Sequence, residues 1–183
     1  MIILSYVLNI LGIALVILSS LIKGEKMTAV LVLVSSGNLL VALGYLAAGS
    51  GINGAASCFA GFLVTLINFC FTSRGRAIPL PLAAVYAVLL VGINIWVGGI
   101  NIHTAIAIAA CLVFIAGIFQ PNGKGYRIFT ILNILLWCTY DLTTKTYSAL
   151  ISHSIQLIFV IVGILANDVF KIKLFEKKGS EEQ

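Results

Sequence analysis

Residues 132–156 read LNILLWCTYDLTTKTYSALISHSIQ, and they place polar side chains inside two long apolar runs. Asn133, Trp137, Tyr140 and Asp141 follow the spacing i, i+4, i+7 and i+8, which puts them on one face of a helix. Polar groups inside a membrane-spanning helix cost free energy unless they are hydrogen-bonded. The stripe therefore predicts a helix whose polar face lies against other helices or against a wet central cavity.

The composition of the whole chain indicates an integral membrane protein. Of the 183 residues, 61% are hydrophobic and only 9% are charged, whereas soluble proteins carry about 25% charged residues. So few charges cannot cover a water-facing surface. Because one span needs about 20 residues, the length suits a single helical bundle.

Charges and Gly, Pro or Asn breaks divide the chain into seven apolar runs, each of which is expected to span the membrane. The runs cover residues 2–22, 27–48, 54–72, 79–97, 102–119, 127–144 and 148–170. The first run is too long for the apolar part of a signal peptide and is expected to remain as a span. The four cysteines lie inside apolar runs without metal-ligand spacing, so they are expected to be packing residues.

Lysine and arginine residues are distributed very unevenly over the connections between these runs. Ten of the eleven lie at 23–26, 74–76, 124–127 and 171–178, and Lys145 alone lies in a connection on the opposite side. The positive-inside rule then predicts an external N-terminus and a cytoplasmic C-terminus. Topology thus accounts for the net charge of +5, and nucleic-acid binding is not expected. A stop-transfer flank explains the basic tail better than a lipid-binding segment does.

Residues 132–156 match residues 37–61, GNLLVALGYLAAGSGINGAASCFAG, at a constant offset of 95 positions. The identities are Asn38 with Asn133, Leu40 with Leu135, Tyr45 with Tyr140, and Ser57 with Ser152. They predict an all-α membrane protein of seven helices, built from two parallel three-helix repeats at 1–73 and 101–170. A linker helix within 74–100 would restore the parallel orientation, and 171–183 would form a basic cytoplasmic tail.

Two segments carry a resemblance to known transporters: NLLVALGYLAAGSGINGAAS at 38–57 and LLWCTYDLTTKTYSALISHSIQLIFVIVGILAND at 135–168. They resemble the YgjV family of bacterial inner membrane proteins. The expected 3+1+3 topology is similar to that of the SWEET sugar transporters and the PnuC vitamin-precursor transporters. The resemblance implies transport of a small polar solute. The chain departs from these families in two respects: Gln120-Pro121 reverses the Pro-Gln pair of PQ-loop proteins, and there are only two tryptophans.

Six residues are predicted to bind the solute, because they combine amide and hydroxyl groups with flat aromatic surfaces. They are Asn133, Trp137, Asn38, Gln156, Tyr140 and Ser152. For the asparagines, hydrogen bonding between helices is an open alternative. For Tyr45 and Tyr140, a position in the aromatic belt at the membrane interface is another.

Asp141 and His153 are predicted to serve in coupling or gating, since ionisable residues inside a span are costly and usually functional. An ion pair between Asp141 and Lys145 at i+4 is an open alternative. For His153 the alternative is a neutral, hydrogen-bonded residue of the bundle.

The function expected from the sequence is facilitated transport of a small polar solute, such as a sugar or a nucleoside or vitamin precursor, by alternating access. A non-transporting scaffold or a small-solute channel is the alternative. The sequence contains no P-loop, HExxH, CxxC or Ser/His/Asp arrangement, so neither catalysis nor a cofactor or metal is expected. The expected partners are the solute and the lipid bilayer, and a homo-oligomer is left open.

Overall fold

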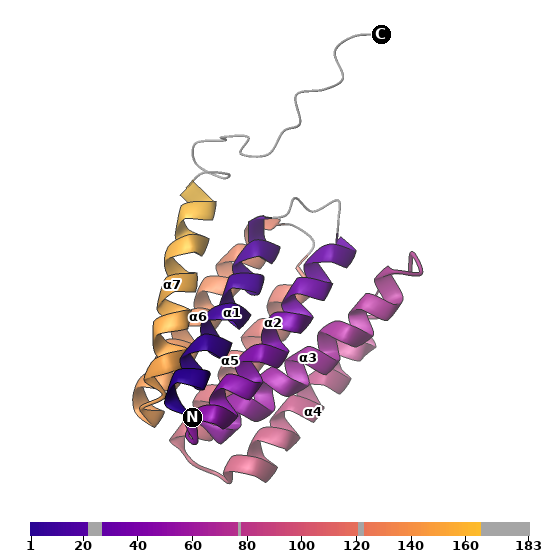
Figure 1. Ribbon diagram of the computed structural model, residues 1–183. Helices are drawn as coiled ribbons and strands as arrows, with labels where there is room; N and C mark the ends of the chain where they lie inside the picture. Colours follow the sequence, from indigo (N-terminus) through magenta and orange to yellow (C-terminus); the bar gives the residue numbers. More distant parts are fainter. Residues whose placement is uncertain (22–26, 77, 121–122, 166–183) are drawn as a thin grey trace, which may run out of the picture.

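The computed structural model describes residues 1–183 apart from 22–26, 77, 121–122 and 166–183 (Figure 1). Within the described part the chain is all-helical: α1 (Ile2–Leu21), α2 (Met27–Ala48), α3 (Ile52–Thr72), α4 (Pro81–Gly98), α5 (Ile102–Ile118), α6 (Gly123–Thr144) and α7 (Tyr147–Ile164). The seven helices predicted from the apolar runs are thus confirmed. Four of them, α1 to α4, are long and apolar enough to cross a membrane, and α5 to α7 carry shorter apolar segments.

Residues with positive φ lie in four of the connections between helices, and one of them is Gly75 at φ 66° between α3 and α4. Gly49 and Gly51, at φ 70° and 71°, end α2 and start α3, and Gly99 at φ 68° follows α4. This left-handed region is open to glycine at little cost. Lys145 at φ 58° is the one non-glycine residue of this kind in the described chain, and it separates α6 from α7.

The helices lie side by side and run up and down in alternation (Figure 1). The N-terminus and the α2–α3, α4–α5 and α6–α7 connections share one end of the bundle, called here the N-terminal end. Helix α1 packs on α2 and α7, α3 packs on α2 and α5, and α6 packs on α5 and α7, so six helices close a ring. Helix α4 packs outside this ring, against α3 and α5.

The predicted division into two groups is compatible with this ring. Helices α1–α3 form one run of adjacent neighbours and α5–α7 form the other, with α4 between them along the chain. The internal symmetry of the two groups stays a prediction. The orientation of the chain in the membrane also stays a prediction. The lysines at 23, 26 and 171–178, on which it partly rests, lie outside the described residues.

The bundle buries polar side chains and exposes large apolar ones. Asn9, Asn68 and Asn94 are fully buried, whereas Val88 is 75% exposed and Trp96 is 86% exposed. Soluble proteins show the reverse pattern, because water favours polar groups at the surface. A hydrocarbon surround explains this arrangement, and we conclude that the protein is embedded in a membrane.

Helices α1 and α2 approach closely where two glycines face each other. A Cβ atom added at Gly12 would lie 2.8 Å from the carbonyl oxygen of Gly37, and one added at Gly37 would lie 2.7 Å from that of Gly12. Small residues permit such close backbone contact in membrane bundles. This contact fixes how α1 and α2 cross on one side of the ring.

Candidate functional site

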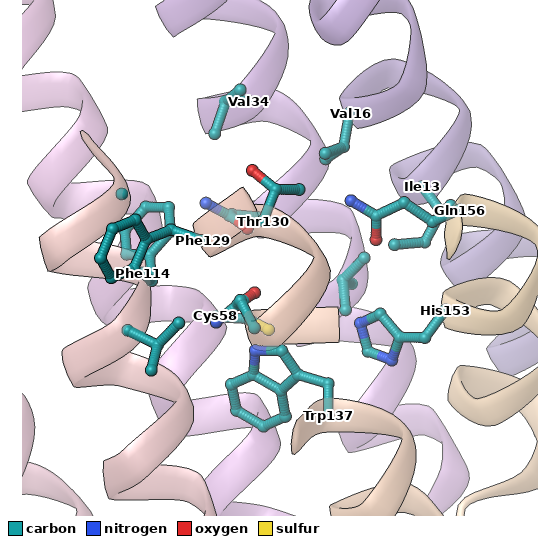
Figure 2. A pocket seen from close by; sticks show the side chains of 15 residues that line it. Ile13, Val16, Val34, Cys58, Phe114, Phe129, Thr130, Trp137, His153 and Gln156 are labelled. Atoms are coloured by element: carbon teal, nitrogen blue, oxygen red, sulfur yellow. The ribbon is translucent and has the colours of Figure 1, made fainter. Parts of the chain in front are cut away.

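A cavity lies at the centre of the ring and is lined by residues of six helices (Figure 2). Its volume is ≈ 80 Å³, counted as the space open to the centre of a water-sized sphere. By that measure one water needs about 10–15 Å³. The cavity therefore has room for several waters or for part of a small solute.

Three amide side chains line this cavity: Asn38 from α2, Asn133 from α6 and Gln156 from α7. Asn133 donates a hydrogen bond of 2.7 Å from Nδ2 to the carbonyl oxygen of Ala110 on α5. Neither Asn38 nor Gln156 makes a side-chain hydrogen bond within the described part of the chain. Because Gln156 is only 7% exposed, its amide has few partners other than what occupies the cavity.

An aromatic floor closes the cavity on the side of the N-terminal end (Figure 2). The rings of Trp137 and His153 are stacked, with centroids 6.1 Å apart and planes at 16°. Behind them, Tyr140 packs edge-on against Trp137 at 5.4 Å, and Tyr45 lies 6.4 Å from Trp137. This layer presents an indole and an imidazole to any solute in the cavity.

A buried hydrogen-bonded group, called here the Tyr45–Asp141–His153 cluster, supports the floor. The Tyr45 hydroxyl donates to Oδ1 of Asp141, and Nδ1 of His153 lies 2.6 Å from Oδ2 of the same carboxylate. An ionised carboxylate can only accept, so Nδ1 carries a proton in this pairing. Nε2 of His153 has no hydrogen-bond partner in the described chain, and the ring lines the cavity.

This cluster argues against the alternatives left open for Asp141 and Tyr45, whereas the alternative for His153, a neutral hydrogen-bonded residue of the bundle, stays open. Asp141 is fully buried, and its oxygens are bound by Tyr45 and His153. The ion pair with Lys145 is therefore wrong for this structure: Lys145 is exposed and forms no salt bridge in the described part. Tyr45 and Tyr140 are each 1% exposed within the bundle, which argues against a place in an interfacial belt.

Further hydrogen bonds join the α1–α3 group to the α5–α7 group at the N-terminal end, beyond the floor. They run from Ser5 to Ser148 at 2.8 Å, Asn9 to Ser148 at 3.3 Å, Ser50 to Thr146 at 3.1 Å, Asn53 to Thr104 at 3.4 Å, and from the Gly54 N–H to the Tyr140 hydroxyl at 3.0 Å. Together with the Tyr45–Asp141 bond they hold the two groups together on this side. The structure is thus closed at the N-terminal end.

The structure brings most of the predicted site residues to one place. Asn38, Asn133, Trp137, His153 and Gln156 all line the cavity. The other three do not line it. Tyr140 lies behind the floor and accepts from Gly54, Asp141 lies behind His153, and Ser152 donates to the carbonyl oxygen of Ser148 at 3.0 Å.

Sequence reasoning missed a second polar group, on the side of α3 that faces α4. Asn94 lies in the predicted linker helix and is not among the predicted site residues, yet it is fully buried and bonds Ser57 and Asn53. Asn53 and Ser57 are four residues apart, which is the signal that could have revealed their shared face. Asn9 was also missed, and its Oδ1 is buried without a hydrogen-bond partner.

The cavity offers amide donors and acceptors, one free imidazole nitrogen and an indole, and among the described residues no lysine, arginine or carboxylate side chain lines it. This chemistry fits an uncharged polar solute with a flat face. No family model, curated protein or solved structure matches the chain.

Proposed function

We propose that this protein transports a small polar solute, such as a sugar or a nucleoside or vitamin precursor, by alternating access. The simplest mode is that of a uniporter in the inner membrane of a bacterium, with the N-terminus outside. The uneven distribution of Lys and Arg supports this orientation. The resemblance to the YgjV, SWEET and PnuC families supports the solute class.

One observation carries the proposal: a central cavity with unpartnered amides lies next to a closed end of the bundle. Gln156 and Asn38 come from different groups of helices and contact the same cavity. An amide that faces a cavity costs free energy unless it finds a hydrogen-bond partner there. A solute that bonds both amides would repay that cost and bridge the two groups.

An opposite conformation would have to break the contacts at the closed end. The cross-links at this end are mainly between neutral groups, such as Ser5 with Ser148 and Gly54 with Tyr140. Each such bond contributes about 1 kcal/mol net and can be exchanged for bonds to water. Rocking of the α5–α7 group against the α1–α3 group would therefore open the N-terminal end at a modest cost.

A second candidate function is a scaffold or channel without a transport cycle, and Asn133 favours it. The Asn133 amide is bonded to Ala110 on the neighbouring helix, which is what helix–helix adhesion requires. A scaffold, however, would have no use for the unpartnered amide of Gln156. The two candidates thus differ in the role that they give to Gln156.

A thermal-shift screen with matched variants tests the proposal. We expect at least one solute from a panel of sugars, nucleosides and vitamin precursors to raise the melting temperature of the purified protein. At a solute concentration of one hundred times Kd, binding would increase the free energy of unfolding by about 2.7 kcal/mol. Gln156→Leu should abolish that shift and leave the unliganded protein as stable as before, because no hydrogen bond is lost.

Asn133→Leu is the matched control, since it removes a bond that the structure does contain. It should lower the stability of the unliganded protein by about 1–2 kcal/mol. A panel that produces no shift with the unmodified protein would contradict the transporter proposal. Equal destabilisation by both variants would contradict the role given to Gln156.

A further inference from the structure

We propose that the Asp141–His153 pair binds a proton that is transported together with the solute, so that the cycle is proton-coupled. The inference rests on the proposed function and replaces uniport, its simplest mode, by coupled transport. It adds a second substrate, H⁺, and assigns its site to the floor of the cavity.

Asp141 and His153 form the one ion-pairing contact between described residues, and both are buried, at 0% and 5% exposure. The titratable groups near Asp141 are Tyr45 from α2, Cys58 from α3, and Cys138 and Tyr140 from α6. From α5, Cys111 faces Cys58 instead of Asp141, and Tyr147 of α7 is exposed. Cysteine and tyrosine ordinarily release protons only near pH 8.5 and 10, as an approximate rule. The pair contains the one imidazole among these groups, and imidazole is the side chain that ordinarily serves as a proton carrier in proteins.

The position of the free imidazole nitrogen defines how the proton is taken up. Nδ1 of His153 is held by Asp141, so the proton must be accepted at Nε2. The His153 ring lines the cavity, from which water can deliver that proton (Figure 2). Uptake converts a carboxylate and a neutral imidazole, with net charge −1, into a carboxylate–imidazolium pair with net charge zero. The same nitrogen releases the proton when the opposite side opens.

Charge neutralisation links this proton to the movement of the helices. A net charge buried in a membrane is unfavourable unless it is compensated, so the protonated pair passes through the occluded state more easily. Protonation of His153 also draws the Asp141 charge toward α7 and weakens the acceptor for Tyr45 of α2. That bond joins the two groups of helices, and its weakening favours opening of the N-terminal end.

The two tryptophans of the chain provide a direct test. Trp137 stacks on His153, while Trp96 is 86% exposed on α4. In a Trp96→Phe variant the remaining indole therefore reports on the imidazole. A stacked imidazolium quenches indole fluorescence more strongly than neutral imidazole does. We expect Trp137 emission to fall as the pH is lowered within about pH 4–9, and adding His153→Gln should remove this loss.

A second measurement leaves the pair intact. The chain has two histidines, so a His103→Gln variant gives ¹⁵N NMR signals from His153 alone. At high pH they should show a proton on Nδ1 and a bare Nε2, and at low pH a proton on both. The proposal would be overturned if both the Trp137 emission and the ¹⁵N signals of His153 stayed constant over this pH range in folded protein. It would also be overturned if the Trp137 emission still responded to pH after His153→Gln.

Neither measurement requires the solute. A folded protein that binds a solute but shows no titration of His153 would exclude proton coupling and leave the proposed transport intact. If His153 titrated but no solute bound, the proton site would be supported, and transport of the tested solutes would be contradicted.

Discussion

Replacing Asp141 by alanine is expected to destabilise the protein by about 3–5 kcal/mol, because it removes one partner of a buried pair. The substitution leaves the Tyr45 hydroxyl and Nδ1 of His153 without an acceptor in a fully buried place. For a chain of this size the loss corresponds to a decrease of roughly 6–20 °C in melting temperature. Thermal unfolding of the purified protein in detergent measures it.

Leu142→Ala is the matched control for this prediction. Leu142 is the next residue on α6 and is 61% exposed, so its truncation should change stability by less than about 0.5 kcal/mol. Asp141→Asn should fall between the two, because its amide oxygen still accepts one hydrogen bond. If Asp141→Ala and Leu142→Ala unfolded at the same temperature, the cluster would not hold α2 against α6 and α7.

Gly12→Ala is expected to destabilise the protein by about 1–3 kcal/mol through overpacking. The new methyl group would lie 2.7 Å from Cγ2 of Val41 and 2.8 Å from the carbonyl oxygen of Gly37. The second contact is with backbone, so only a shift of α1 relative to α2 can relieve it. Such a shift would also disturb the neighbouring cavity wall, to which Ile13 belongs.

Gly92→Ala on α4 is the internal comparison, because a Cβ atom there has no neighbour within 4 Å. Alanine has a higher helix propensity than glycine, so this change should be neutral or slightly stabilising. Denaturant or thermal unfolding of the two variants side by side provides the measurement. Equal stability of Gly12→Ala and Gly92→Ala would mean that the contact between α1 and α2 is not tightly packed.

The sequence predicted the helices well because the physical cause is local. Apolar runs of about 20 residues form the helices, and charges or Gly, Pro or Asn breaks separate them. The predicted start of the third span at residue 54 is two residues later than that of α3, at Ile52. Gly51, in the left-handed conformation, allows the helix to begin there.

Membership of the cavity could be predicted only in part. Helical spacing correctly grouped Asn133 with Trp137, but it cannot show which neighbouring helix a polar face meets. Tyr140 and Asp141 belong to the same stripe, yet they bind Gly54 of α3 and Tyr45 of α2 behind the floor. These partners depend on the packing of distant segments, which no local pattern contains.

The importance of Asn94 was underestimated for a related reason. One asparagine in an apolar helix is weak evidence by itself, and the linker helix was assigned a purely topological role. Asn94 in fact meets Asn53 and Ser57, from a helix more than thirty residues earlier in the chain. Helix α4 is therefore bound to the ring by a buried polar group in addition to apolar contacts.

Alternating access requires that water reach Gln156 in the cavity during the cycle. The most direct test of this requirement is the reactivity of a cysteine at position 156 toward a membrane-impermeant thiol reagent, with the four natural cysteines replaced by serine. Ile158→Cys, two residues further along α7 and 61% exposed on the outer surface, is the control. We predict that Gln156→Cys reacts in oriented vesicles, while Ile158→Cys stays unreactive. No reaction of Gln156→Cys from either side of the membrane would contradict the account.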